Sequence, residues 1–355
     1  MGKIKTLHIS ETFVSGVYTY IKQLNNYSEK NDLKTFIIYS GERSENKEIL
    51  EKDFSMNTEL ICIHMTREIT LFKDIVSLIN IIKEVRRIKP DVIHVHSSKA
   101  GVLGRIARIF HLKAKLFYTP HGYSFLREDI SNKKKKIYRF VELVTTKIFG
   151  GTIVACGDQE YEEASKLGKA VLVRNGIDLN DFKKYEEHIP NKILTIGTSG
   201  NIYEPKNPSF FNELASKLPQ YKFMWIGDGE LKNRLNSEVV EISGWKSRED
   251  ALALVNNLDV FISTSLWEGL PFNIIEAMAM SKPIISSNIK GNRVTISQNK
   301  NGFLCNNLEE FIEEIKKLED KDIRDLFGKE SKHMVDELFN LNKNFIQLIN
   351  LYKSK

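Results

Sequence analysis

Residues 258–276 read LDVFISTSLWEGLPFNIIE, and they predict a strand, a turn and a helix in direct succession. The apolar run Leu258–Ser263 is typical of a buried strand. Pro271 or Phe272 stands where the first helical turn begins, a position that tolerates proline because its N–H would have no partner within the helix. The other N–H groups of that turn are left free, with the positive end of the helix dipole behind them. The stretch therefore predicts an anion site suited to a diphosphate.

Short apolar runs alternate with helical stretches on both sides of this block, which favours parallel sheets covered on both faces. The strands expected in the first half are Ile4–Ser10, Lys34–Ser40, Glu59–His64, Asp91–His96, Lys115–Thr119, Thr152–Cys156 and Ala170–Val173. The strands expected in the second half are Ile193–Ser199, Tyr221–Ile226, Glu238–Ile242, Leu258–Ser263 and Pro283–Ser286.

A turn at Asn175–Asp178 and a polar stretch, Leu179–Asn191, separate the two series of strands. We therefore predict an α/β fold with two Rossmann-like domains, residues 1–180 and 181–335. We also expect a C-terminal helix, residues 336–355, that packs back on the first domain. Two such domains that face each other form a cleft at the carboxyl ends of their strands, where ligands bind in folds of this kind.

Composition narrows the class of protein. The 355 residues are 41% hydrophobic and 28% charged, which excludes disordered and collagen-like chains. The net charge of +6 favours phosphates or an anionic membrane surface and is too small to indicate a nucleic-acid partner. The three cysteines, Cys62, Cys156 and Cys305, are isolated and match no zinc spacing, so we expect a reduced, cytoplasmic protein.

Two carboxylates flank the predicted anion site. Glu268 lies in the loop before the helix, and Glu276 lies about one turn inside it. Carboxylate oxygens accept hydrogen bonds from hydroxyl groups, which sugars present in pairs. A phosphate site between two such acceptors favours a ligand that carries both a diphosphate and a sugar.

The block at residues 264–285, TSLWEGLPFNIIEAMAMSKPII, resembles the Glu-x7-Glu signature of the retaining glycosyltransferases of family 4, which have the two-domain GT-B fold. The resemblance implies that Glu268 holds the donor sugar and that Glu276 binds the nucleotide ribose. It also implies that the sugar and the diphosphate are bound by Gly269, Leu270, Pro271, Phe272 and Asn273.

The resemblance extends over most of the chain. Residues 91–104 are similar to the fourth strand and following loop of the family, and residues 173–178 to its domain junction. Residues 118–125, YTPHGYSF, resemble the loop that brings a histidine, here His121, to the donor sugar. Lys206 matches the lysine that grips the donor diphosphate. The turns that carry Gly227, Gly244 and Trp245 would line the pocket of the nucleotide base.

Two positions depart from the family pattern. Asn201 stands where the family usually has an arginine, about five residues before the lysine. Asparagine lacks the bidentate, permanently charged fork of arginine, so neutralisation of the diphosphate would rest on Lys206 and the helix end. Ser15 and Gly16 stand where the family often has two glycines, and Gly16 still allows close approach of backbone to phosphate.

Two histidines spaced two apart on a strand, His94 and His96, are a pattern that metal ligands can show. No third ligand is evident in the sequence, so structural histidines are the favoured interpretation, and His8 carries no usable signal. No Asp-x-Asp follows a strand, so a metal-bridged diphosphate is not indicated. We expect a metal-independent reaction that requires no cofactor.

Basic residues gather in two places. Lys133–Lys136 opens a helix, and a second group intersperses with apolar residues: Lys99, Arg105, Arg108, Lys113 and Lys115. These residues form either a solvated helix face or a peripheral patch that meets anionic lipid headgroups at the inner face of the cell membrane. A lipid-linked acceptor would favour the second alternative.

These observations predict a hexosyltransferase that moves a hexose or N-acetylhexosamine from a nucleotide diphosphate sugar to a glycan acceptor. UDP is the favoured nucleotide, and the anomeric configuration of the sugar is expected to be retained. Glu268, His121 and Lys206 are its expected catalytic residues. The acceptor expected by analogy is a lipid-linked glycan of surface-polysaccharide synthesis. Two alternatives remain, a sugar-nucleotide 2-epimerase of the same fold and a non-catalytic member that binds a nucleotide sugar.

Overall fold

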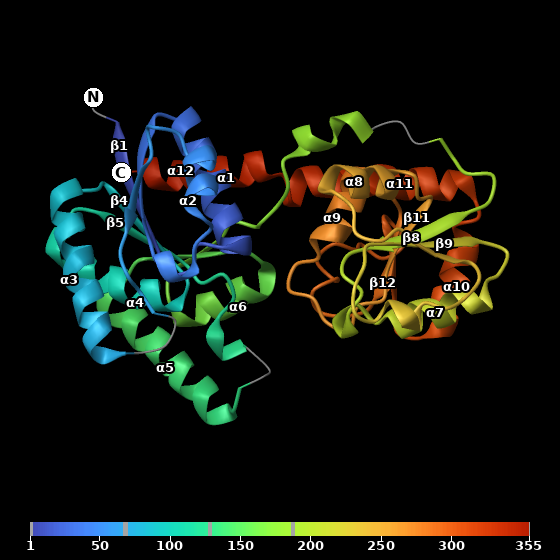
Figure 1. Ribbon diagram of the computed structural model, residues 1–355, viewed down its shortest axis with the longest axis horizontal. Helices are drawn as coiled ribbons and strands as arrows, with labels where there is room; N and C mark the ends of the chain where they lie inside the picture. The colour runs from blue at the N-terminus through green and yellow to red at the C-terminus, as the bar shows by residue number, and fades with distance from the viewer. Residues whose placement is uncertain (1–2, 67–69, 127–129, 186–188, 355) are drawn as a thin grey trace. The chain divides into compact units, whose positions relative to one another are not determined.

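The computed structural model describes residues 3–66, 70–126, 130–185 and 189–354, and the chain divides into two compact units. Unit 1 consists of Met1–Asn175 together with Asn342–Lys355, and unit 2 consists of Gly176–Leu341. Each unit contains one parallel sheet with helices packed on it (Figure 1). The predicted α/β class, with two Rossmann-like domains, is therefore confirmed.

The sheet of unit 1 has the strand order β3-β2-β1-β4-β5-β6-β7, and all its neighbouring strands are parallel. Its strands are β1 (Ile4–Ser10), β2 (Leu33–Tyr39), β3 (Glu59–Cys62), β4 (Val92–His96), β5 (Lys115–Thr119), β6 (Thr152–Ala155) and β7 (Ala170–Leu172). Its helices are α1 (Ser15–Lys30), α2 (Lys47–Asp53), α3 (Leu71–Ile88), α4 (Ser98–Ala107), α5 (Asn132–Phe149), α6 (Asp158–Leu167) and α12 (Leu341–Lys353).

The centre of this sheet is closed to water on both faces. Every residue of β4, which reads VIHVH, is buried, because the strand lies between β1 and β5. The register of β1 against β4 places His8 opposite His94 and Ser10 opposite His96. Parallel pairing thus brings histidines that are far apart in the sequence to one end of the sheet.

The sheet of unit 2 has the order β10-β9-β8-β11-β12-β13 and is also parallel throughout. Its strands are β8 (Thr195–Ser199), β9 (Lys222–Ile226), β10 (Val240–Ile242), β11 (Val260–Ser263), β12 (Ile284–Ser287) and β13 (Gly302–Cys305). Its helices are α7 (Pro208–Lys217), α8 (Arg248–Asn256), α9 (Phe272–Ala279), α10 (Leu308–Lys317) and α11 (Lys321–Leu338). The edge strand β13 is not among the strands expected from the sequence.

The C-terminal helix α12 packs on unit 1 and covers strands of its sheet (Figure 1). The hydroxyl of Tyr352 hydrogen-bonds to Nδ1 of His94, and Nζ of Lys115 donates to the carbonyl oxygen of Tyr352 at 2.8 Å. Phe345 packs edge-on against Tyr20 and Tyr27 of α1. The last residues of the chain therefore complete the core of its first unit.

Candidate functional site

The carboxyl ends of β8 and β11 bring a lysine and a glutamate into contact in unit 2. Nζ of Lys206, in the loop after β8, lies 2.5 Å from Oε1 of Glu268, in the loop after β11. Each side chain is only 15% exposed, so the ion pair is largely shielded from water. Ser265 donates its hydroxyl to the same oxygen at 2.8 Å. The charges of Lys206 and Glu268 therefore neutralise each other.

Backbone contacts hold these two loops together. The N–H of Leu266 donates to the carbonyl oxygen of Pro205 at 2.8 Å. The hydroxyl of Thr264 donates to the carbonyl oxygen of Lys206, also at 2.8 Å. Because the two loops are joined on both sides of the lysine, the position of Lys206 relative to Glu268 is set by the fold of unit 2.

The helix that follows Glu268 begins as the sequence predicts. Helix α9 starts at Phe272, with Pro271 at the N-cap, which forms no side-chain cap, and its first turn has no acidic residue. Two N–H groups of this turn have acceptors within the protein: that of Phe272 donates to the carbonyl oxygen of Leu270, and that of Ile274 to Oδ1 of Asn273, each at 3.0 Å. What the helix start offers an anion is mainly the positive end of its dipole. The side chain of Asn273 has a structural role, because its Nδ2 donates to the carbonyl oxygen of Ser199 at 2.8 Å.

Glu276 lies inside α9 beside an arginine that the sequence analysis did not identify. Nη2 of Arg248, the first residue of α8, lies 2.7 Å from Oε1 of Glu276. Burial raises the pKa of Glu276, and the neighbouring guanidinium group lowers it. A half-buried carboxylate with a positive neighbour can accept hydrogen bonds from the hydroxyl groups of a ribose.

Glycines allow the loops after β8 and β9 to approach each other closely. Gly227 has a φ of +148°, and a Cβ at this position would lie 2.2 Å from the carbonyl oxygen of Gly200. A Cβ on Gly229 would lie 2.6 Å from Oδ1 of Asn201. Asn201 therefore packs directly against the Gly227–Gly229 turn.

The loop after β10 carries the other two residues expected at the nucleotide base. Gly244 has a φ of +69°, and a Cβ there would meet no atom within 4 Å. Trp245 follows it with an exposed side chain. Ser243 joins this loop to the neighbouring one, because its hydroxyl accepts a hydrogen bond from the N–H of Gly227 at 3.1 Å.

Unit 1 holds His121 in a constrained loop after β5. Its backbone φ is +53°, a conformation that costs energy for any residue other than glycine, and such strain is often found at functional sites. The carboxylate of Glu160 accepts hydrogen bonds from the N–H groups of Gly122, at 2.7 Å, and Cys156, at 2.6 Å. Burial raises the pKa of Glu160 and lowers that of His121 to about 3.

Gly16, the residue of unit 1 expected near a phosphate, lies in the first turn of α1. A Cβ at Gly16 would meet no atom within 4 Å, so space is open beside it. The preceding Ser15 has a φ of +53°. The first turn of α1 has no acidic residue and no side-chain cap.

Both halves of the chain match known families. Residues 14–181 match the family described as Glycosyltransferase Family 4, and residues 180–335 match the family described as Glycosyl transferases group 1. A relative from Escherichia coli, UDP-Gal:alpha-D-GlcNAc-diphosphoundecaprenol alpha-1,3-galactosyltransferase, is 30% identical over 322 residues, which cover 81% of each protein. The chain belongs to glycosyltransferase family 4. This glycosyltransferase is therefore an enzyme that takes its sugar from a nucleotide-sugar donor, as predicted.

Other comparisons agree on the fold. The Staphylococcus aureus protein CapM, a capsular polysaccharide biosynthesis glycosyltransferase, is 26% identical over 345 residues, which cover 88% of each chain. A glycosyltransferase from Rickettsia africae has a TM-score of 0.78 at 21% identity over 99% of this chain and 98% of its own. HepE of Anabaena, solved in complex with UDP, has a TM-score of 0.79 at 15% identity over 99% and 100%. The predicted GT-B class with C-terminal helices is confirmed.

Among the residues predicted for the site of this glycosyltransferase, the structure brings Lys206 into contact with Glu268 and packs Asn201 against the Gly227 turn. His121 belongs to unit 1, whereas Lys206 and Glu268 belong to unit 2. Arg248, Ser265 and Glu160 were missed. No local sequence pattern predicts a role for these residues, because that role follows only from the side-chain contacts that they make in the folded protein.

Two expectations about the basic residues of unit 1 are wrong. Arg105 is buried beside Glu142, with its guanidinium group over the ring of Tyr118, and so it belongs to the core. Lys99 is only 10% exposed, and its Nζ lies 2.6 Å from Oδ1 of Asp74. Opposite charges inside the unit attract both side chains, so neither can face a lipid surface.

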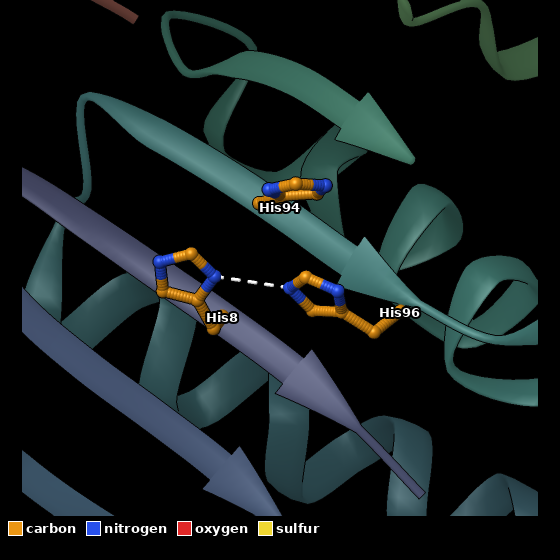
Figure 2. A group of neighbouring side chains, drawn as sticks. All are labelled: His8, His94 and His96. Atoms are coloured by element: carbon orange, nitrogen blue, oxygen red, sulfur yellow. Dashed lines mark hydrogen bonds between the residues drawn. The ribbon is translucent and has the colours of Figure 1, made fainter. Parts of the chain in front are cut away.

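The interpretation of the histidines also requires a correction. No third ligand beside His94 and His96 is evident in the sequence, but the structure places His8 next to them (Figure 2). One nitrogen of each ring can be chosen so that the three atoms lie within 4.8 Å of one another, and all three rings are buried. His8 escaped notice because only the pairing of β1 with β4 brings it there.

Proposed function

We propose that this glycosyltransferase moves a hexose or N-acetylhexosamine from a UDP-sugar to a hydroxyl group of a lipid-linked glycan, with retention, in surface-polysaccharide synthesis. The observation that carries the proposal is the shielded pair of Lys206 and Glu268 beside the uncapped start of α9. The relatives support the donor and the acceptor. The E. coli relative is named for UDP-Gal and a diphosphoundecaprenol acceptor, and HepE was solved with UDP.

The charges at the site fit departure of a nucleoside diphosphate. As the glycosidic bond breaks, negative charge grows on the diphosphate, and the charge of Lys206 and the positive end of the α9 dipole stabilise it. Lys206 then exchanges its contact with Glu268 for the phosphate, and Glu268 is released to accept hydrogen bonds from sugar hydroxyls. The leaving phosphate takes the proton of the acceptor hydroxyl on the same face of the sugar. These protein groups supply the positive charge, so we propose a metal-independent reaction.

Nucleotide binding tests the donor directly. UDP is expected to raise the thermal midpoint of the protein by about 5 °C at a hundred times its Kd, because a ligand at that level stabilises the folded state by about 2.7 kcal/mol. GDP and ADP are expected to raise it less at equal concentration. The screen is run both without and with a chelator. A response to UDP that vanishes with the chelator would contradict metal independence, and a larger response to GDP or ADP would contradict the nucleotide.

Product analysis separates transfer from epimerisation. When the UDP-sugar selected by the screen is incubated with the enzyme alone, NMR is expected to show no new sugar nucleotide. When a glycan-diphosphate-lipid acceptor is added, an α-linked product is expected from an α-linked donor. A second sugar nucleotide formed without acceptor would instead identify a 2-epimerase.

We also propose that unit 1 contacts an anionic membrane through α5. This helix exposes apolar side chains along one stripe, with Ile137 at 59%, Phe140 at 64% and Ile148 at 66% exposure. Its first turns carry Lys133–Lys136, of which Lys133, Lys134 and Lys136 are exposed and Lys135 is half-buried. An apolar stripe beside a run of lysines fits the boundary between acyl chains and anionic headgroups. No helix in the described part of the chain meets the length and hydropathy of a membrane span.

The double variant Ile137→Ser with Phe140→Ser is expected to reduce co-sedimentation with vesicles of phosphatidylglycerol and phosphatidylcholine at least tenfold. The two side chains together contribute more than about 2 kcal/mol of apolar burial. Leu326→Ser is the matched control, because Leu326 is 63% exposed but lies on α11 of unit 2. Equal binding of both variants, or equal binding of the wild type to phosphatidylcholine alone, would contradict the proposed surface.

A further inference from the structure

Three histidine rings of unit 1 form a hydrogen-bonded chain that ends at His121. Nδ1 of His8 lies 3.0 Å from Nε2 of His96 (Figure 2), and Nδ1 of His96 lies 3.1 Å from Nε2 of His121. His8 and His96 are buried in β1 and β4, and His121 is half-buried in the loop after β5. The ring of His96 also stacks on that of His121, with centroids 5.3 Å apart.

All three rings are neutral at physiological pH. Burial lowers the pKa of His8 to about 4 and that of His121 to about 3, and it holds the pKa of His96 well below its ordinary value. A neutral imidazole has one N–H and one bare nitrogen. Because His96 uses both nitrogens, it must accept from one neighbour and donate to the other. The two hydrogen bonds therefore run in the same direction along the chain.

The free nitrogen of His8, at the end of the hydrogen-bonded row of histidines opposite His121, decides the direction of the two hydrogen bonds. Nε2 of His8 is buried and has no hydrogen-bond partner among the residues that the structure describes. If His121 donates to His96, and His96 to His8, then His8 carries an N–H at this position with no acceptor. If the chain runs the other way, the nitrogen there is bare. Orphaned N–H groups are the rarer defect in protein interiors, so His8 is expected to donate to His96, and His96 to His121.

We infer that His96 and His8 are positioning residues that hold the proton of His121 on Nδ1. Nε2 of His121 accepts the hydrogen bond from His96, which leaves Nδ1–H as a fixed donor. Such a donor can bind an oxygen atom of a substrate but cannot take up a proton. The inference rests on the proposed function only where it assigns this donor a role in sugar transfer.

His94 lies beside the hydrogen-bonded histidines His8, His96 and His121 but makes no hydrogen bond to them. Its Nδ1 hydrogen-bonds to the hydroxyl of Tyr352, and its Nε2 lies 2.7 Å from the hydroxyl oxygen of Thr119. A metal ion held by His8, His94 and His96 would have to break hydrogen bonds of His94 and His96, because both nitrogens of each ring are already engaged. The contacts therefore favour a hydrogen-bonded row of histidines over a metal centre. Substitution of His94 is a matched control, because His94 lies beside this row and makes its hydrogen bonds elsewhere.

The position of the proton can be read by NMR of protein labelled with ¹⁵N-histidine, because two-bond ¹H–¹⁵N correlations distinguish Nδ1–H from Nε2–H. The signals of His121 are assigned from the variant His121→Asn. In the wild type we expect His121 to carry its proton on Nδ1. In His96→Phe the Nε2–H form, which free histidine prefers, is expected to become the major species. In His94→Phe the Nδ1–H form is expected to persist.

A second variant covers the event that His96→Phe does not fold. His8→Phe leaves His96 free to reverse its hydrogen bond, so both forms of His121 are expected to appear. An Nε2–H form in the wild type, or an unchanged Nδ1–H form in both variants, would overturn the inference. So would one equivalent of divalent metal in the purified protein whose removal shifts the signals of His8, His94 and His96.

Kinetics test the link to sugar transfer. His96→Phe is expected to lower kcat about tenfold, the lower end of the loss that follows removal of a residue that orients a metal-ligating histidine, with the KM of the donor within about twofold. His94→Phe is expected to keep kcat within about threefold. Equal losses in the two variants would overturn the positioning role. If His121→Asn keeps full activity while the NMR result is as expected, the proposed function is contradicted. The hydrogen bonds that hold the proton of His121 on Nδ1 would still be established.

Discussion

Replacing Lys206 by alanine is expected to lower kcat about 100- to 1,000-fold, the largest loss that we predict for any single side chain of this enzyme. Removal of one group that stabilises developing negative charge typically costs this much. Lys206 is the charged donor that the structure places beside Glu268 and near the start of α9, and Asn201 has no charge to replace it. The KM of the donor is expected to change much less, because the interaction strengthens as the bond breaks.

The contact between Lys206 and Glu268 complicates a single substitution. Removal of the lysine leaves a shielded carboxylate without its partner, and that charge would itself repel a diphosphate. Glu268→Gln and the double variant Lys206→Ala with Glu268→Gln separate the two effects. If repulsion dominates, the double variant recovers activity relative to Lys206→Ala, and if lost stabilisation dominates, it does not.

Turnover of the donor is measured at saturating acceptor, with Lys321→Ala as the control. Lys321 is an exposed lysine of α11 whose Nζ lies 2.5 Å from Oδ2 of Asp325. Like Lys206 it is paired with a carboxylate, but it lies outside the proposed site. We expect the control to retain full activity and Glu268→Gln to lose at least tenfold. Losses below about tenfold in both Lys206→Ala and Glu268→Gln, roughly 1.4 kcal/mol each, would contradict the proposed site.

Local patterns predicted most of the strands because parallel strands buried on both faces read as short apolar runs. β1 and β5 have the predicted bounds, and the other expected strands differ from them by a few residues at the ends. The strand β13 was missed for a physical reason. It has four residues and begins at Gly302, where a Cβ would lie 2.0 Å from the carbonyl oxygen of Ile284. Close packing requires glycine there, and glycine weakens the signal of a strand.

Contacts between distant residues limited prediction of the site. The anion site at α9 could be predicted because strand, turn and helix are consecutive. The pairing of Arg248 with Glu276, and of His8 with His96, depends on helix packing and strand register, which residue order alone does not specify. Arg105 illustrates the same limit, because a buried arginine and an exposed one look alike until Glu142 is placed beside it.

Gly227→Ala is expected to reduce the free energy of unfolding of unit 2 by about 3 kcal/mol. A residue with a side chain pays about 1 to 3 kcal/mol for a backbone conformation that only glycine adopts readily, and Gly227 has a φ of +148°. The new Cβ would also lie 2.2 Å from the carbonyl oxygen of Gly200. That oxygen accepts a hydrogen bond from Nε1 of Trp225 at 3.0 Å, so it cannot withdraw without breaking a second contact.

Two other glycines separate the causes of this loss. Gly244→Ala adds a methyl group in open space at a φ of +69°, so it should show the conformational cost alone, about 1 kcal/mol. Gly269→Ala also meets no atom within 4 Å and has no positive φ, so it should cost less than about 0.5 kcal/mol. The excess of Gly227→Ala over Gly244→Ala then measures the clash with Gly200.

Unfolding in urea, followed by tryptophan fluorescence, measures all three variants, because Trp225, Trp245 and Trp267 all lie in unit 2. The loop that Gly227 would displace leads from Gly200 to Lys206, so loss of stability should be accompanied by weaker UDP binding at temperatures where the variant is still folded. If Gly227→Ala is no less stable than Gly244→Ala, the loops after β8 and β9 are not in close contact. The position of Lys206 would then depend on hydrogen bonds such as those at Pro205 and Thr264, and not on the packing of Gly227 against Gly200.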